Sequence, residues 1–352
     1  MMRKFIKIFV IFTMLVSFYL PVKANQTTNL YVYTNDTSKF NEYAIKNVGL
    51  HMYCFNEYID SSLKLGEGIS LFGDLTYPIV LYPIWKNDEI VATYKVANVN
   101  GTFTGTYSDA NAEELNSIKD LTSSATPLII YVNDGTFGKI GTNVYNLNGI
   151  NLSEYPNISI ENEGLEIKDV SNCLEYEEIS LTRAPVSYSN DWTTYYHDPS
   201  FTTHCYTFCL YNIFLNLGIT QYSFNDIRSG ILIGLGVASI PSINSYLTSE
   251  GFTYSYATSG YTPIATVRNI IYNNDNYIMA GLTYITGDKV GLKHFMAMYG
   301  YMSVSGTKWY RVWDPQSTGT GKLVIDGSTM EVIDSNNVIL KWNGGYIGSF
   351  DK

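Results

Sequence analysis

Two cysteines four residues apart are the first candidates for chemistry in this chain of 352 residues. Cys205 and Cys209 lie in the stretch THCYTFCLYNIFLNLG (203–218), whose apolar residues cover most of the helix that their spacing predicts over 205–217. Cys205 comes in the expected first turn, where unpaired backbone N–H groups and the helix dipole favour a thiolate and can stabilise an oxyanion. Cys209, one turn further on, is predicted to be a packing residue. Considered alone, Cys205 could equally be a buried, inert thiol.

A histidine and an aspartate are predicted to meet across a hairpin far downstream. The segments 293–302 and 308–314 indicate two strands, and the first of them is apolar on both faces. If the loop between them is centred near residue 305, His294 faces a position near 316. Asp314 lies two residues from that position and therefore on the same face. The sequence thus predicts Asp314 beside the imidazole of His294, although a core histidine with a strand-end aspartate would fit as well.

Taken together, these three residues indicate nucleophilic catalysis by a thiolate. A Cys at a helix start, a His on a sheet strand and an Asp that orients the His form the arrangement of a papain-like nucleophile. A zinc site fits less well, because Cys205 and Cys209 have no second Cys/His pair to complete four ligands. The only further candidates nearby, His197 and His204, would make a loose cluster. A disulfide between the two helical cysteines is disfavoured, since their side chains point outward a turn apart.

Residues 203–350 resemble the staphopain type of secreted papain-like cysteine peptidase, and more loosely the bacteriocin-leader peptidase-like domains. The matching segments are the Cys-led helix at 205–218, the segment 241–252, and above all HFMAMYGYMSVSGTKWYRVWDPQSTG at 294–319. In such families a His-x-Met-Ala strand is followed by a strand that ends in Asn-Pro or Asp-Pro. The resemblance implies that Cys205 is the nucleophile, His294 the base and Asp314 the orienting residue. It implies no metal and no cofactor.

The chain departs from this family's pattern just before the nucleophile. The family usually has a Gln a few residues ahead of the Cys, and its side chain completes the oxyanion hole, but no Gln occurs between Arg183 and Cys205. Tyr206 also replaces the usual small residue after the Cys. Loss of one oxyanion donor costs on the order of a hundred-fold in rate. Four residues could take the place of the Gln, and the sequence does not choose among them: Asn190, Tyr196, His197 and Thr203.

The elements around these residues predict an α+β fold for the second half of the chain. Helices are indicated at 205–217, from Asn225-Asp226, at 241–251 and at 262–275. Five strand-like segments follow, at 277–285, 293–302, 308–314, 322–326 and 338–342. Helices first and an antiparallel sheet second match a papain-like domain with a helical half and a β half. We assign it to residues 184–352.

The first half of the chain reads as a separate α+β unit. A helix is predicted over about 39–59, strands at 69–73, 78–85, 89–97 and 126–132, and a short helix at 109–121. The segment 67–96 resembles the inhibitory half-barrel propeptides of the same family. Residues 25–183 would then be a propeptide-like domain that acts as an intramolecular inhibitor. The polar segment 150–190 is a plausible linker, with Arg183-Ala184-Pro185 as an exposed processing site.

Charge and cysteine content limit the function classes. Residues 25–183 hold 21 acidic and 9 basic residues, a net of −12, whereas 184–352 hold 11 and 9, a net of −2. A chain of net charge −10 lacks the basic stripe of a nucleic-acid binder. Four cysteines do not make a disulfide scaffold. Cys54 and Cys173 could form a bridge or be two buried thiols.

The N-terminal segment indicates secretion. Arg3, Lys4 and Lys7 precede an apolar run that ends at Val22-Lys23-Ala24, which is the pattern of a cleaved signal peptide over 1–24. The run from Ile8 to Val22 is short for a membrane-spanning helix, which needs about 20 residues. We therefore expect a secreted protein with no stable membrane association and no nucleic-acid partner.

These observations predict a secreted cysteine endopeptidase that is made as a zymogen and hydrolyses peptide bonds in protein or peptide substrates. Two alternatives stay open. A domain with a damaged oxyanion hole could serve as a secreted binding module, or the same three residues could catalyse Cys-dependent acyl transfer to an amine.

Overall fold

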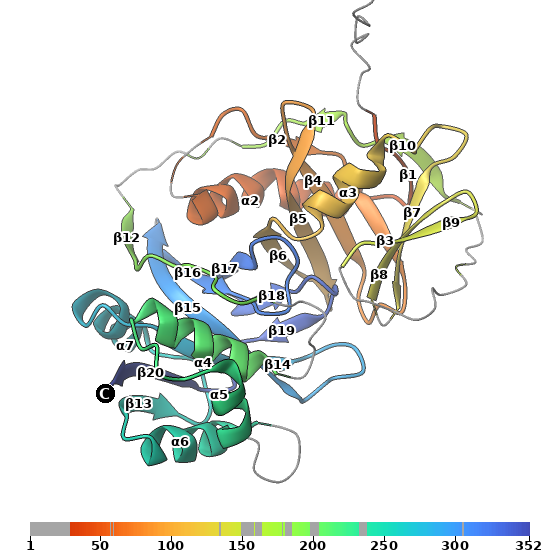
Figure 1. The fold of residues 1–352 in the computed structure, drawn as a ribbon. Helices are drawn as coiled ribbons and strands as arrows, with labels where there is room; N and C mark the ends of the chain where they lie inside the picture. Colours follow the sequence, from red (N-terminus) through yellow and green to blue (C-terminus); the bar gives the residue numbers. More distant parts are fainter. Residues whose placement is uncertain are drawn as a thin grey trace, which may run out of the picture.

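The computed structural model describes residues 29–352, except residues 57, 59, 134, 149–157, 159–163, 178, 180–184, 198–203, 232–237 and 305. The predicted signal peptide, the Arg183-Ala184 part of the predicted processing site and Thr203 lie outside the described residues. Helices and a largely antiparallel sheet make up the described part of the chain (Figure 1).

The part of the chain after residue 185 places helices against both faces of an antiparallel sheet. Its elements are β12 (Val186–Ser189), α4 (Cys205–Asn216), α5 (Phe224–Ile231), α6 (Ile240–Ser249), β13 (Thr253–Ala257), α7 (Ile264–Arg268), η1 (Asn269–Asn273), β14 (Ile278–Tyr284), β15 (Lys293–Val304), β16 (Thr307–Trp313), β17 (Lys322–Asp326), β18 (Glu331–Ile333), β19 (Ile339–Lys341) and β20 (Tyr346–Asp351). The central strand β15 pairs with β14 and β12 along one edge and with β16 along the other. The segment predicted as one helix over 262–275 is α7 followed by the π-helical turn η1.

Two apolar cores sandwich the central strand, because its side chains alternate between faces. Phe295, Ala297 and Tyr299 pack with α4, α5 and α6 on one face. Met296 and Met298 pack on the other face with residues of α7, η1 and β17. Figure 1 shows α4 lying across β15. The strand is therefore buried on both faces, as its composition predicts.

The register of the β15–β16 hairpin is the one predicted from the loop position. Ala297 pairs with Trp313 and Met298 with Val312. A bulge between Met298 and Gly300 shifts the register by one residue on the side of the loop. On the side of His294 the register stays as predicted, and this brings the end of β16 to the start of β15.

The first part of the chain forms a second group of strands with two helices. Its elements are β1 (Tyr31–Thr34), α2 (Ser38–Asn56), β2 (Lys64–Gly66), β3 (Ile69–Gly73), β4 (Ile79–Lys86), β5 (Glu89–Val99), β6 (Thr102–Ser108), α3 (Ala112–Lys119), β7 (Leu128–Asn133), β8 (Gly135–Ile140), β9 (Asn143–Asn146), β10 (Glu166–Asp169) and β11 (Cys173–Leu174). The 86–88 hairpin loop has Asn87 and Asp88 at positive φ, as tight two-residue turns require. β4, β5 and β6 form an antiparallel meander, and β3 and β1 pair in parallel with β7. Whether this unit is the half-barrel of the family's propeptides stays a prediction.

The two parts of the chain share both a sheet and a core. Leu323 of β17 pairs with Ser108 of β6, so that the sheet continues from one part into the other. One apolar cluster combines residues of α2, β4 and β5 with Met302, Val304, Trp309 and Val324 of β15, β16 and β17. Figure 1 shows β6 of the first part of the chain beside β17, which belongs to the blue C-terminal part. Below, residues 29–179 are called the N-terminal unit, and residues 185–352, which contain the candidate catalytic residues, are called the catalytic unit.

Candidate active site

Cys205 is the first residue of α4. In the first turn, the N–H groups of Thr207 and Phe208 donate to the carbonyl oxygen of His204 at 2.9 and 3.1 Å, so the N–H of Cys205 itself is the candidate donor to a developing oxyanion. The Cys205 side chain is almost buried, with 7% of its surface exposed. Its neighbour Tyr206, unusual at this position in the family, is buried in the core around α4. The helix therefore holds the Cys205 thiol at its N-terminal end, next to the sheet.

Cys209 lies deeper in the same helix and has a packing role, as predicted. It is fully buried, and its thiol donates a hydrogen bond to the carbonyl oxygen of Phe295 at 3.2 Å. Burial, followed by repulsion from Cys205 and Asp314, raises the pKa of the Cys209 thiol well above its ordinary value. Cys209 is thus held as an inert thiol, which leaves Cys205 as the candidate nucleophile of this helix.

His294 and Asp314 form a buried pair. Nε2 of His294 lies 2.8 Å from Oδ1 of Asp314, and both side chains are excluded from solvent. His294 is the second residue of β15 and Asp314 follows the end of β16, so the hairpin register alone brings them together. The same Oδ1 accepts a hydrogen bond from the backbone N–H of Gln316 at 2.9 Å, which holds the carboxylate in place.

Opposing effects set the protonation of His294. Burial alone would lower its pKa, but the negative charge of Asp314, the proximity of Cys205 and hydrogen bonds with both side chains raise it to about 10. Since Nε2 is engaged by Asp314, Nδ1 is the nitrogen left to face Cys205. The arrangement thus favours an imidazolium at neutral pH, with the Cys205 sulfur as its partner.

Sequence reasoning missed the polar residues around this pair. The Tyr284 hydroxyl donates to Oε1 of Gln316 at 3.3 Å, and the Tyr284 ring lies 5.9 Å from the imidazole of His294. Burial raises the pKa of Asp334 to about 6, helped by the charge of Asp314 and opposed by a hydrogen bond from the Val338 backbone and by the charges of Lys95 and His294. Strand spacing places Tyr284 on β14 opposite β15, but nothing in the sequence near Asp334 signals its closeness to His294.

Of the four residues considered for the missing Gln, three are described, and one of these, His197, contacts the residue before Asp314. The Asn190 side-chain amide donates to the carbonyl oxygen of Asn276 at 2.7 Å. Tyr196 stacks on Phe208 at a centroid distance of 5.2 Å. His197 lies 5.7 Å, centroid to centroid, from Trp313, the residue before Asp314. It lines a hollow of about 330 Å³ together with Trp192 and the loop residues Gly319 and Thr320.

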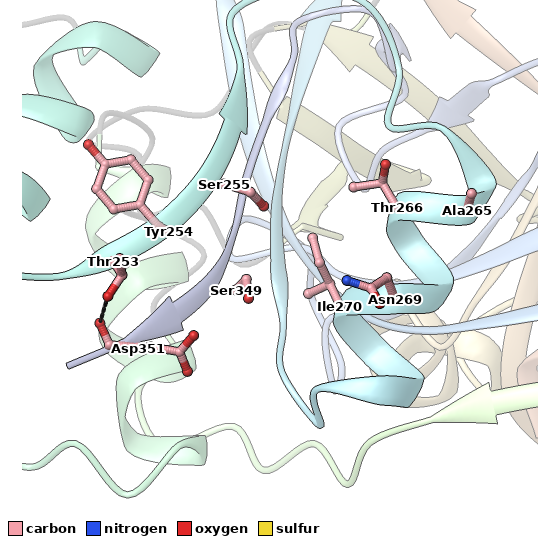
Figure 2. A pocket seen from close by; sticks show the side chains of 9 residues that line it. All are labelled: Thr253, Tyr254, Ser255, Ala265, Thr266, Asn269, Ile270, Ser349 and Asp351. Carbon is pink, nitrogen blue, oxygen red and sulfur yellow. Dashed lines mark hydrogen bonds between the residues drawn. The ribbon is translucent and has the colours of Figure 1, made fainter.

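A larger hollow lies elsewhere in the catalytic unit. Figure 2 shows nine side chains around a groove of about 530 Å³ between the β13–β20 strands and the α7–η1 segment. Hydroxyl and amide side chains such as Ser255, Thr266 and Asn269 line much of it. Cys205, His294 and Asp314 are not among its lining residues. The groove is therefore separate from the candidate catalytic residues.

Three further features concern metal binding, disulfides and membrane-spanning helices. Among the described residues, no group of three or more His, Cys, Asp or Glu side chains could hold a metal ion. Cys54 and Cys173, left open as a bridge, are both free thiols, the first buried and the second exposed. In the described part of the chain, no helix combines the length and apolar character needed to cross a bilayer.

The chain has limited similarity to known proteins. It is similar to the crystal structure of the peptidase domain of Streptococcus ComA, described as a bi-functional ABC transporter involved in a quorum sensing pathway. The match has 18% sequence identity and a TM-score of 0.25, and covers 42% of this chain and 91% of that domain. No protein-family model and no curated protein matches the chain. A functional interpretation therefore depends on the geometry of the site.

Proposed function

We propose that this chain is a cysteine peptidase of the papain-like type, with Cys205 as nucleophile, His294 as acid and base, and Asp314 as the residue that orients His294. One observation carries the proposal. A buried His294–Asp314 pair at 2.8 Å has its remaining ring nitrogen toward a cysteine at a helix N-terminus. A buried histidine whose pKa is raised by a carboxylate and a thiol has the properties of an ion-pair partner for a thiolate.

The proposed reaction follows from these positions. The Cys205 thiolate attacks the carbonyl carbon of a peptide bond, and the backbone N–H of Cys205 stabilises the oxyanion. The His294 imidazolium gives its proton to the leaving amine, and a thioester to Cys205 remains. Water then attacks the thioester while His294 accepts its proton, which releases the acid product and restores the ion pair. Asp314 keeps Nε2 of His294 bonded throughout, so that Nδ1 faces the sulfur.

We further propose that the protein is secreted and made as a zymogen, with the N-terminal unit as its intramolecular inhibitor. The pattern of residues 1–24 supports secretion. The low exposure of all three catalytic side chains supports a covered site. Contacts of the N-terminal unit with the loop after Asp314 also support it: Asp109 accepts from the backbone N–H of Thr320 at 2.9 Å, and Thr318 accepts from that of Asn111 at 2.8 Å.

The test is alkylation of Cys205 by a thiol-reactive peptidyl inhibitor, with the modified residue identified by mass spectrometry. The protein is used as the full chain and as processed protein, from which proteolysis has removed the N-terminal unit. We expect rapid labelling of Cys205 in the processed protein, slow labelling in the full chain, and loss of rapid labelling in His294→Ala. Cys209→Ala is the matched control, since it changes a thiol in the same helix and should leave labelling and hydrolysis intact.

The alternatives predict other results. Slow labelling that Cys205 shares with Cys209 would contradict an activated nucleophile and favour a secreted binding module. Rapid labelling together with amide products formed from an added amine would assign acyl transfer to the same residues. Hydrolysis with no such product supports the peptidase.

A further inference from the structure

A lysine of the N-terminal unit is buried in the catalytic unit. Lys95 lies in the middle of β5 and is 2% exposed. Its Nζ donates to the carbonyl oxygen of Asp334 at 2.9 Å and to that of Ser335 at 3.2 Å. These carbonyls belong to the turn between β18 and β19, which is separated from Lys95 by about 240 residues of chain. Among the described residues, both carbonyl oxygens that accept from this buried cation lie across the interface, and their loss would leave its N–H groups without these acceptors.

The turn that receives Lys95 is linked to the catalytic aspartate. The Ser335 hydroxyl donates to the carbonyl oxygen of Gln316 at 3.0 Å, and the N–H of Gln316 donates to Asp314. The Asp334 carboxylate is buried and accepts two backbone N–H groups of its own turn at 2.9 Å. The backbone N–H of Val338 and the positive charges of Lys95 and His294 oppose the rise of the Asp334 pKa. Loss of Lys95 would leave the two carbonyl oxygens without their donor and remove one of these positive charges.

Other contacts of the N-terminal unit surround the same turn. The Asn337 side-chain amide donates to the Thr136 hydroxyl at 2.7 Å, and the backbone N–H of Ile333 donates to the Thr106 hydroxyl at 2.8 Å. Beside them, Trp309 packs under α2 and is 3% exposed. Departure of the N-terminal unit would expose this apolar face together with the turn. These contacts do not involve the connection around residues 179–185.

We propose that Lys95 is a latch that keeps the N-terminal unit bound to the catalytic unit after the chain between them is cut. Cleavage between Ile179 and Pro185 then yields a two-chain complex, and the active site is uncovered only when the latch opens. This inference extends the proposed zymogen, but the binding itself does not depend on catalysis. Activation therefore requires release or a further cut within the N-terminal unit, besides cleavage of the connection.

The test uses the full chain in the Cys205→Ala background, with a specific protease site inserted between Ile179 and Pro185. After cleavage, size-exclusion chromatography should show both fragments in a single peak. Mixing complexes with labelled and unlabelled N-terminal fragments then gives the rate of fragment exchange. We expect Lys95→Met to speed exchange about 10- to 100-fold, the range for removing one partner of a buried hydrogen-bonded group.

Lys119→Met is the matched control. Lys119 is also buried in the N-terminal unit, but its Nζ donates to the carbonyl oxygen of Asp88 within that unit. It should therefore exchange at the wild-type rate. If Lys95→Met does not fold, Asp334→Asn provides a second variant. Removal of the Asp334 carboxylate should speed fragment exchange less than removal of the Lys95 charge. It should also reduce the effect of a change at Lys95 made in the same protein. Separation of the wild-type fragments after cleavage, or equal exchange of the two lysine variants, would overturn the latch. Neither result bears on Cys205 reactivity.

Discussion

The charge of Asp314 decides how strongly His294 holds its proton. Burial disfavours the imidazolium, and Asp314 is the first of the groups that outweigh burial and bring the pKa of His294 to about 10. A peptidase that uses this imidazolium as its acid loses activity as the pH rises through that pKa. In Asp314→Asn the acceptor Oδ1 stays but the charge is lost, so we expect the alkaline limb of the pH profile for peptide hydrolysis to move down by roughly 1–3 units.

The measurement is kcat/KM for a peptide substrate between neutral pH and pH 11, in wild type and variant. The Asn side chain still accepts from the N–H of Gln316, so the loop geometry is kept and the charge is the variable. An alkaline limb that stays in place would mean that Asp314 does not set the proton affinity of His294. A lower plateau with an unmoved limb would point to the same conclusion.

The β15–β16 hairpin is the element that brings His294 to Asp314, and Gly300 is its tightest point. A Cβ at Gly300 would lie 2.8 Å from Cβ of Ser189 and 3.2 Å from the carbonyl oxygen of Tyr188, both on β12. Gly300→Ala should therefore push β12 away and lower the free energy of unfolding by about 1–3 kcal/mol. Urea unfolding measures the loss, and adding Ser189→Gly should restore part of it. No loss, or no recovery, would show that β12 is not closely packed here.

The same hairpin shows how far the sequence predicts the site. A strand apolar on both faces and a short loop near residue 305 were enough to predict the pairing of Ala297 with Trp313 and the meeting of His294 with Asp314. The apolar periodicity of 205–217 likewise predicted the helix that begins at Cys205. These features depend on local patterns, because hairpin register and helix faces follow from residues close in the chain.

Such local patterns do not predict contacts between segments that lie far apart in the chain. The short strands β12, β13 and β20 have mixed composition and gain their order from neighbours in the sheet. Lys95 lies in the strand predicted at 89–97, where nothing nearby in the sequence indicates that it is buried against Asp334. The partner of Lys95 depends on how the two units pack together, and local sequence periodicity does not predict it.

At the scale of the whole molecule, the two units meet around a neutral histidine. His51 of α2 is fully buried, with its ring 4.9 Å from that of Tyr94 and 4.6 Å from that of Trp309 in the catalytic unit. Neither ring nitrogen has a hydrogen-bond partner in the described structure. Burial lowers the pKa of His51 to about 3. The joined units therefore exclude the proton that a solvated imidazole takes up near pH 6.5.

Stability should consequently fall in acid through His51. Its folded pKa lies below the unfolded value, so the unfolded chain binds more protons between pH 6.5 and pH 3, and the contribution of His51, full above pH 6.5, is lost as the pH falls. In His51→Phe this loss is absent. We expect the unfolding free energy of the variant, relative to wild type, to rise by about 3 kcal/mol between pH 7 and pH 4.

Urea unfolding of both proteins in the Cys205→Ala background gives this difference without interference from proteolysis. Carboxylates titrate alike in the two proteins, so their contribution cancels when the variant is compared with wild type at each pH. A difference that stays constant with pH would mean that His51 can be protonated in the folded chain. Acid would then not weaken the contact between the N-terminal and catalytic units through protonation of His51. If the difference in unfolding free energy between the two proteins grows as the pH falls, the contact around His51 weakens in acid, independently of the latch at Lys95.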